Sequence, residues 1–212
     1  MSNGNYQETH ERILKSGLAA FLEEGFEKAN LRRICKAAGV TTGAFYKHFK
    51  DKEALFSELV EPLASMIRKA YAQGEKRGFA GYDEGKPVTP EQVRAALEAK
   101  AAGTLATTAM LYSHRDIYEL LVFRSYGTPY EHFLDWLVDE EDRTPLRVLE
   151  LIHGAEKART VISKESLHIV NHAFYSALSE NIIHAKSVEE LNATTEVIST
   201  FFNAGWEKYR TL

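Results

Sequence analysis

The chain is poor in cysteine and contains no long apolar run. Its one cysteine, Cys35, stands among 212 residues, so no internal disulfide and no cluster of cysteine metal ligands can form. A single thiol fits a reducing compartment, and we expect a cytoplasmic protein. No stretch of about 18 apolar residues occurs, which argues against a membrane span. The polar first residues, MSNGNYQETHER, do not have the pattern of a signal peptide.

Patterns of catalytic and cofactor-binding residues are also missing. The chain has no nucleophile elbow, phosphate-binding loop or metalloprotease pattern, so we predict neither an enzyme nor a bound cofactor. His168 and His172 lie four residues apart on one expected helix and could share a metal. No Glu or Cys at a suitable spacing completes the set, so no metal site is predicted. Cys35 is expected to be a small buried side chain rather than a redox sensor.

Basic residues gather in one short part of an acidic chain. The net charge is −4, yet residues 28–52 hold seven basic side chains and one acidic one, which gives them +6 and leaves −10 on the remainder. This asymmetry indicates a polyanion as the partner. A solvated basic face has the same pattern, and charge alone does not decide between the two.

The hydrophobic pattern predicts an all-α protein. Apolar residues recur at helical spacing, five prolines interrupt them, and no run alternates as a strand does. Helices are expected over residues 8–24, 31–38, 41–48, 51–73, 89–113 and 116–124. A further helix is expected through Leu137, with a break or a kink at the acidic residues 139–142 and Pro145 before residues 146–153. The last two are expected over 163–185 and 187–209. The expected caps and capping boxes are at Asn30, Thr41, Asp51, Thr89 and Ser187. Residues 74–90 hold four glycines and two prolines and are expected to form a loop.

Two short helices joined by the glycine turn at Gly39 form the pattern of a helix-turn-helix unit. A helix that enters the major groove of DNA needs small or polar residues on its outer face. The second helix begins with such residues: Thr41, Thr42, Gly43 and Ala44. Its other face holds apolar residues that would dock it on the core: Val40, Phe45 and Phe49. Side chains suited to bind phosphates follow nearby: Tyr46, Lys47, His48 and Lys52.

The segment from Ile13 to Leu55 resembles the N-terminal signature of the TetR (tetracycline-repressor) family of transcriptional regulators. The matching motifs are Phe21-x-x-x-Gly25-Phe26, Ile34-x-x-Ala37-Ala38-Gly39-Val40, Thr42-Gly43-Ala44-Phe45-Tyr46-x-His48-Phe49 and Asp51-Lys52-Glu53-x-Leu55. The resemblance implies that Tyr46, His48 and Lys52 bind phosphates. It assigns contacts at or near the base edges to Thr41, Thr42, Gly43 and Lys47. Asn30 and Arg32, at the start of the preceding helix, are also expected to meet DNA.

The chain departs from the family pattern beside these motifs. The family usually has threonine where Ala29 and Asn30 stand, often has an acidic residue near Arg33, and usually has alanine at Cys35. Asn30 preserves the helix cap, and Arg32 and Arg33 add positive charge. The resemblance therefore does not predict the operator sequence.

The resemblance further implies two domains. Residues 1–52 would form a three-helix DNA-binding domain, and residues 53–212 a helical domain that binds a ligand and dimerises. A ligand pocket is mostly apolar with a few polar groups. The residues of the second part that fit this description are Leu105, Thr108, Tyr112, Phe123, Phe133, Trp136 and Tyr175. Each of them could equally belong to the core.

The last two expected helices carry apolar residues at nearly heptad spacing, the pattern of a helix-packing seam. In the TetR family the last two helices usually dimerise as a four-helix bundle. The dimer contacts predicted here are Val170, Phe174, Leu178, Leu191, Ile198 and Phe202. The alternative is an ordinary core within one chain.

These observations predict a ligand-responsive regulator, a repressor by resemblance, that binds a palindromic operator in double-stranded DNA as a homodimer. A small molecule, which the sequence does not identify, would release it. The alternative is a helical small-molecule-binding or protein-interaction module without DNA binding. Pro62 falls inside the expected helix 51–73, where it would kink the helix as a hinge or only bend it around the core.

Overall fold

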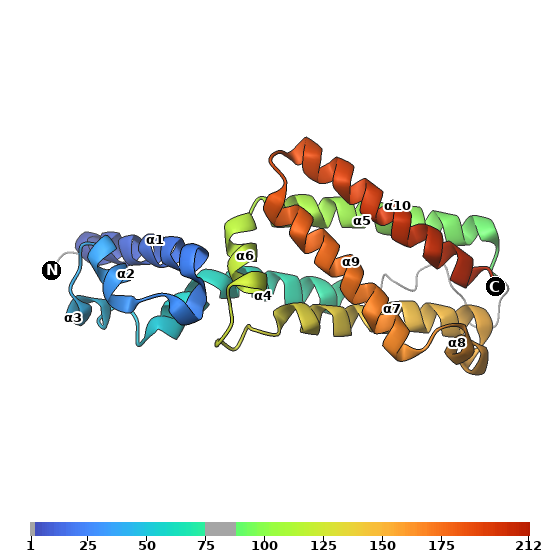
Figure 1. The fold of residues 1–212 in the computed structure, drawn as a ribbon, viewed down its shortest axis with the longest axis horizontal. Helices are drawn as coiled ribbons and strands as arrows, with labels where there is room; N and C mark the ends of the chain where they lie inside the picture. The colour runs from blue at the N-terminus through green and yellow to red at the C-terminus, as the bar shows by residue number, and fades with distance from the viewer. Residues whose placement is uncertain (1–2, 75–87) are drawn as a thin grey trace. The chain divides into compact units, whose positions relative to one another are not determined.

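The computed structural model describes residues 3–74 and 88–212 and is helical throughout those ranges, with short connections between the helices (Figure 1). Its contacts divide the chain into two compact units. The first is Met1–Arg68 with His114–Phe133, and the second is Lys69–Ser113 with Leu134–Leu212. Most of the expected loop 74–90 lies outside the described residues. None of the described helices is long and apolar enough to cross a membrane.

The first unit contains the predicted helix-turn-helix. Its helices are α1 (Asn3–Lys28), α2 (Leu31–Ala37), α3 (Thr42–Phe45), the first part of α4 (Lys52–Gly74), and α6 (Arg115–Phe123). The unit closes around side chains that are fully buried: Ile13, Phe21, Ile34, Phe45 and Phe56. Helix α6 packs on α1, and the backbone N–H of Phe26 donates to the carbonyl of Arg124 at 2.9 Å.

The second unit contains the rest of α4 with α5 (Pro90–Tyr112), α7 (Phe133–His153), α8 (Ala155–Val161), α9 (Lys164–His184) and α10 (Val188–Arg210). Helix α10 packs along α5 and against α9. One buried cluster of this unit consists of Val93, Leu97, Leu149, Ala158, Ile162, Leu167 and Trp206. The aromatic ring of Trp206 therefore joins α10 to the other helices of this cluster through apolar burial.

The predicted helix caps agree with the structure, although α1 begins at Asn3 rather than at residue 8. The side chains of Asn30, Thr41 and Ser187 accept hydrogen bonds from backbone N–H groups of the helices that follow. Asp51 accepts from the N–H of Ala54 at 2.7 Å, and Thr89 forms the expected capping box with Gln92. Gly25 has a φ of 75°, the left-handed conformation expected where the first helix was predicted to end, although helical residues continue to Lys28.

Three expectations about helix extent were wrong. Helix α3 has four residues rather than eight, because the N–H groups of Lys47 and His48 turn to carbonyls three residues back. Helix α7 runs through Pro145 as one helix, so the helix does not break there, and only the expected kink remains open. Val138 and Leu149 are buried on either side of the proline, so packing outweighs the one lost backbone bond. Helix α8 was not predicted, because its seven residues hold too few apolar side chains for a periodic pattern.

The compact units do not coincide with the domains expected from the sequence. The first unit includes α4 up to Arg68 and the segment around α6. A compact unit is defined by packing. The expected boundary after residue 52 instead separates the part expected to bind DNA from the part expected to bind a ligand. That boundary stays a prediction.

Candidate nucleic-acid interface

Helix α3 is held on the first unit by its apolar face. Phe45 is fully buried and Phe49 is 3% exposed, with their rings 5.5 Å apart. Ile34 and Cys35 of α2 are buried beside the glycine turn, and burial raises the pKa of the Cys35 thiol. Cys35 is thus a buried thiol held in the neutral form, as the sequence indicated.

The opposite face of α3 is directed to solvent. Thr41, Gly43 and Lys47 are exposed and Thr42 is half-buried. The hydroxyl of Thr41 is used as the helix cap and accepts from the N–H of Ala44 at 3.1 Å. The predicted base-reading residues therefore share one surface, and Thr41 also has a structural task.

Gly43 has no steric reason within the chain to be glycine. A Cβ built on it would approach only the Thr41 Oγ1, at 4.0 Å, and its φ is not in the left-handed region. Gly17 is different, because a Cβ there would lie 2.8 Å from Cδ2 of Leu55, which is fully buried. Gly17 is required by close helix packing, whereas the open space over Gly43 favours a close approach from outside the chain.

The predicted phosphate-binding side chains differ in their surroundings. Tyr46 is 56% exposed and meets Phe45 edge to face, so its hydroxyl can reach a phosphate. His48 is half-buried, with its ring 4.1 Å from the ring of Tyr6. Burial, and then the positive charges of His10 and Lys47, lower the pKa of His48. His48 would therefore act as a neutral hydrogen-bond donor rather than a cation.

The structure corrects the role of Lys52. Its Nζ donates to the carbonyl oxygens of Phe26, Glu27 and Ala29 at 2.6, 3.1 and 3.0 Å. An ammonium group has three N–H bonds, and all three are occupied by the C-terminal turn of α1. Lys52 therefore caps the end of α1, and these bonds do not favour the phosphate contact that its motif predicts. No sequence pattern indicates this role, because the partners are backbone atoms.

The start of α2 lies on the same unit. Asn30 and Arg32 are exposed, as a DNA contact requires, and the Asn30 side chain is engaged as the cap of α2 through the N–H of Arg32 at 2.9 Å. Arg33 forms an ion pair with Glu24 of α1. Arg32 thus fits a phosphate contact better than Arg33 does.

The seven predicted ligand residues are divided between the two units. Phe123 and Phe133 belong to the first unit, and Phe133 is buried there under the guanidinium of Arg68. The other five belong to the second unit: Leu105, Thr108, Tyr112, Trp136 and Tyr175. The sequence could not separate the two groups, because apolar residues of both units follow the same helical spacing.

One polar cluster inside the second unit includes two of the predicted ligand residues. The hydroxyl of Tyr175 lies 3.3 Å from that of Tyr71, whose ring meets Trp136 edge to face. Lys100 pairs with Glu141 at 3.0 Å. Burial, and then the carboxylate of Glu141, raise the pKa of Tyr175. None of the sequence predictions included Tyr71, Lys100 or Glu141. A signal existed for Lys100, because it is a lone lysine in a stretch of mostly small and apolar residues.

A groove of about 450 Å³ runs between α5 and α10 of the second unit. Leu105 lines it together with Leu97, Glu98 and Ser199. The volume is within the range of small-molecule sites. Thr108 and Tyr112 do not line this groove. Thr108 is buried, and the Tyr112 hydroxyl donates to the carbonyl of Ala185 at 3.2 Å.

Half of the predicted dimer contacts are core residues of their own chain. Phe174, Leu178 and Leu191 are at most 7% exposed, so they cannot meet a partner. Ile198 and Phe202 are half-buried and Val170 is 37% exposed. The heptad spacing therefore marks the seam between α9, α10 and α5 within one chain, which was the alternative interpretation.

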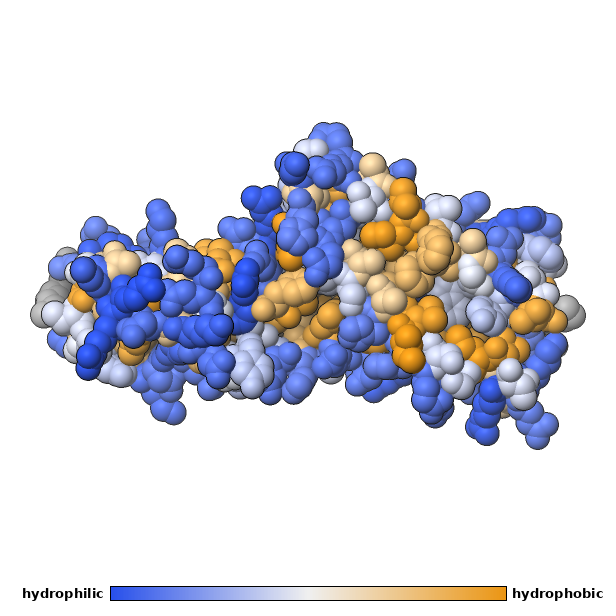
Figure 2. Space-filling view, in the orientation of Figure 1, coloured by the Kyte–Doolittle hydropathy of each residue, from blue (hydrophilic) through white to orange (hydrophobic). Residues whose placement is uncertain are grey.

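A different row of apolar side chains on α9 and α10 is exposed. Ile169, Val197 and Phe201 are 67%, 69% and 75% exposed. The exposed residues Ala173 and Ala204 continue the two rows at helical spacing. Figure 2 shows apolar side chains gathered on the face over these helices. We call Ile169, Val170, Ala173, Val197, Phe201 and Ala204 the apolar face.

Residues 13–59 match the family model described as bacterial regulatory proteins, tetR family. The chain is 53% identical over 61 residues to the HTH-type transcriptional regulator AcrR of Shigella flexneri. Those aligned residues make up 29% of this chain and 28% of that protein. It is 32% identical over 81 residues to an HTH-type transcriptional repressor of Mycobacterium tuberculosis, covering 38% and 42%. The chain thus matches less than half the length of these relatives.

Among solved structures, a transcriptional regulator of Aquifex aeolicus aligns with 92% of this chain and 99% of its own, at 20% identity and a TM-score of 0.49.

Proposed function

We propose that this chain, whose residues 13–59 match the model of the tetR family of bacterial regulatory proteins, is a transcriptional repressor that binds operator DNA. The observation that carries the proposal is the two-sided helix α3. Its Phe45 side is buried in the unit, and its Thr41, Gly43 and Lys47 side is exposed. The stretch 28–52, which carries a charge of +6, gives this part of the unit the positive charge that duplex DNA attracts.

The proposed contact residues divide into two classes of DNA contact. Thr42, Gly43 and Lys47 are proposed to lie at the base edges of the major groove, where small residues let the backbone approach. Tyr46, His48 and Arg32 are proposed to bind phosphates, which position the helix without selecting sequence. Lys52 is left out, since α1 uses its ammonium.

The operator is proposed to be a palindrome read by a homodimer. A single recognition helix contacts few base pairs, and a twofold dimer places two such helices about 34–36 Å apart. The apolar face of α9 and α10 supports this arrangement, because large apolar side chains such as Phe201 are costly to leave in water.

A small molecule is proposed to release the DNA by favouring a second conformation of the dimer. The cluster of Tyr71, Lys100, Trp136, Glu141 and Tyr175 supports a ligand site in the second unit. It offers aromatic surface with a few convergent polar groups, which is the composition of small-molecule sites. A DNA-binding regulator of this kind acts in the cytoplasm.

The test is selection of bound sequences from random duplex DNA with the full chain. We expect a palindrome whose half-sites are about one helical turn apart. Affinity for it should fall steeply with salt, because phosphate contacts release counterions. Binding that enriches no sequence and has no salt dependence would instead favour a helical binding module without a DNA target.

A further inference from the structure

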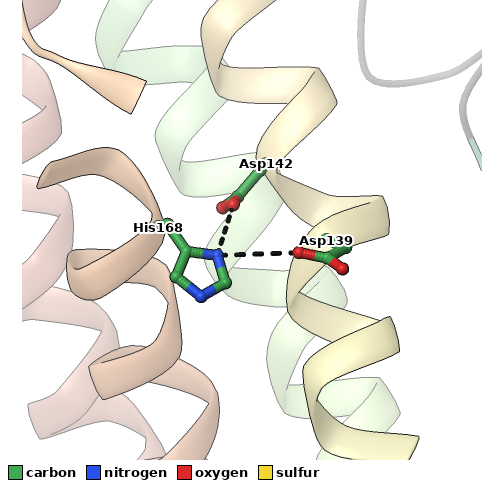
Figure 3. A group of neighbouring side chains, drawn as sticks. All are labelled: Asp139, Asp142 and His168. Carbon is green, nitrogen blue, oxygen red and sulfur yellow. Dashed lines mark hydrogen bonds and ion pairs between the residues drawn. The ribbon is translucent and has the colours of Figure 1, made fainter. Parts of the chain in front are cut away.

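Two aspartates of α7 and one histidine of α9 converge in the second unit (Figure 3). The Nδ1 of His168 lies 2.9 Å from Oδ2 of Asp142 and 3.7 Å from Oδ1 of Asp139. One ligand atom from each of the three side chains lies within 4.8 Å of the others. We propose that Asp139, Asp142 and His168 form a binding site for a divalent transition-metal ion, of which zinc is the representative.

The spacing of the three ligand atoms suits a small ion. A tetrahedral ion about 2.0–2.1 Å from each ligand holds neighbouring ligand atoms about 3.3 Å apart. The two distances from His168 Nδ1, 2.9 and 3.7 Å, lie on either side of that value. Small side-chain shifts therefore admit the ion, and the 68% exposed Asp139 side chain leaves room for water as a further ligand.

The negative charge of α7 favours binding of a dication at this site. Residues 135–142 of α7 include five acidic side chains. Glu140 and Glu141 have cationic partners in Arg143 and Lys100. Asp139 and Asp142 instead share the one imidazole of His168. A dication at this point balances the two negative charges of the aspartates.

A buried amide already orients the central ligand. Asn171, which is 2% exposed, donates from Nδ2 to Oδ1 of Asp142 at 2.6 Å. That bond directs the other oxygen, Oδ2, toward His168. Metal-bound carboxylates are commonly held by an outer hydrogen bond of this kind, and its loss weakens metal binding.

The mixed ligand set selects the class of ion. Imidazole nitrogen suits zinc and its first-row neighbours, whereas calcium and magnesium prefer all-oxygen sites. Facing helices of a bundle are a common scaffold for such sites. Here α7 contributes Asp139 and Asp142, which are three residues apart, and α9 contributes His168. The sequence did not suggest the set, because α7 and α9 are distant along the chain.

The test is zinc titration of the full chain after removal of metals with a chelator, followed by calorimetry. We expect one zinc ion per chain. His168→Ala and Asp139→Asn should each weaken binding by at least about tenfold, as should Asn171→Ala through the outer hydrogen bond. Magnesium under the same conditions should not compete. His184→Ala is the matched control, because His184 forms a pair with Glu180 on the same helix and should leave zinc affinity unchanged.

Cobalt provides a second measurement, since its visible absorption reports the ligands directly. The bands should appear in the wild type and in His184→Ala and be absent from His168→Ala, with equal helix content by circular dichroism. Absence of zinc binding in the wild type, or equal binding by the wild type and His168→Ala, would overturn the site. The measurement uses no DNA, so neither result depends on whether the proposed repressor function is correct.

Discussion

The ammonium of Lys52 lies 4.4 Å above the ring of Phe26 and donates at 2.6 Å to the carbonyl oxygen of the same residue. This one side chain joins the start of α4 to the end of α1, and it holds the two helices that flank the helix-turn-helix. Burial lowers the pKa of Lys52, so the bonds are formed by a partly desolvated cation. A motif residue that would be assigned to DNA is thus part of the scaffold.

We therefore predict that Lys52→Met lowers the free energy of unfolding by about 1.5–3 kcal/mol, the range for hydrogen bonds to a charged group. Urea denaturation measures this change. The exposed neighbour Lys50 is the control, and Lys50→Met should shift stability by less than about 0.5 kcal/mol. If Lys52→Met kept full stability but reduced the salt dependence of DNA binding, Lys52 would be a phosphate contact after all.

Gly43→Ala should separate DNA binding from folding. The added methyl meets open space in the chain, and alanine favours a helix over glycine by about 1 kcal/mol, so stability should be unchanged or higher. Operator affinity should fall at least about tenfold, equivalent to about 1.4 kcal/mol, because the methyl intrudes on the groove. Fluorescence anisotropy with operator DNA measures the loss.

The matched control for that variant is Gly103→Ala. Gly103 lies within α5, and a Cβ added there would also meet nothing closer than 4 Å. It should gain the same helix stability without loss of DNA affinity. Equal affinity of Gly43→Ala and the wild type would show that Gly43 does not lie against DNA.

Stability should depend on acid pH through Glu61. Tyr130 donates to its Oε2 at 2.8 Å, and this bond, with help from Arg68, lowers the pKa of Glu61 below its ordinary value of 4.5. A carboxyl whose pKa is depressed by folding adds stability above its unfolded pKa, and that stability is lost as pH falls through the folded pKa. Between about pH 6 and about pH 3, the wild type should therefore lose more stability than Tyr130→Phe. The difference should be less than about 1 kcal/mol, because the Glu61 side chain is 48% exposed and solvent screens the interaction.

Urea midpoints at the two pH values measure this difference. Tyr126→Phe is the control, because Tyr126 is 68% exposed and its change should leave the acid dependence as in the wild type. An identical acid dependence in Tyr130→Phe would mean that the Tyr130 bond does not set the pKa of Glu61.

The apolar face should control assembly. Phe201→Glu places a charge on its most exposed aromatic residue and should yield a folded monomer with weaker operator binding, as analytical ultracentrifugation and anisotropy would measure. Val188→Glu is the control, since Val188 is exposed at the start of α10, about half a turn around the helix from Val197. A Phe201→Glu protein that dimerised like the wild type would place the interface elsewhere.

Pro62 is a candidate hinge between DNA and ligand responses. It lies inside α4 and deprives the carbonyl of Glu58 of its helical N–H partner. If the kink transmits ligand binding, Pro62→Ala should keep operator affinity in the absence of ligand and lose most of the ligand response in the anisotropy assay. A variant with an unaltered response would reduce Pro62 to a bend in the helix.

The sequence predicted most of what depends on local patterns. Caps such as Asn30 and Thr41, the inward Phe45, and the buried Cys35 follow from residue type and spacing, and the structure agrees with each of them. These features are local because a cap or a docking face is set within a few residues.

Features that depend on which helices meet were predicted poorly. Phe174 and Leu178 were assigned to a partner chain, although both are buried within their own chain, where α9 packs against α10 and α5. The facing arrangement of Asp142 and His168 was not foreseen either. Periodicity shows that a helix has an apolar face but not what covers it.

The most direct test of the central claim is the salt dependence of binding to the selected operator, compared between the wild type, Lys47→Ala and Lys52→Met. We expect tight binding by the wild type and a loss of affinity in Lys47→Ala, with a change of the logarithmic salt slope of about one. Folded Lys52→Met should keep the slope of the wild type. If the wild type bound duplex DNA without sequence preference or salt dependence, the assignment of α3 as a DNA-reading helix would be contradicted.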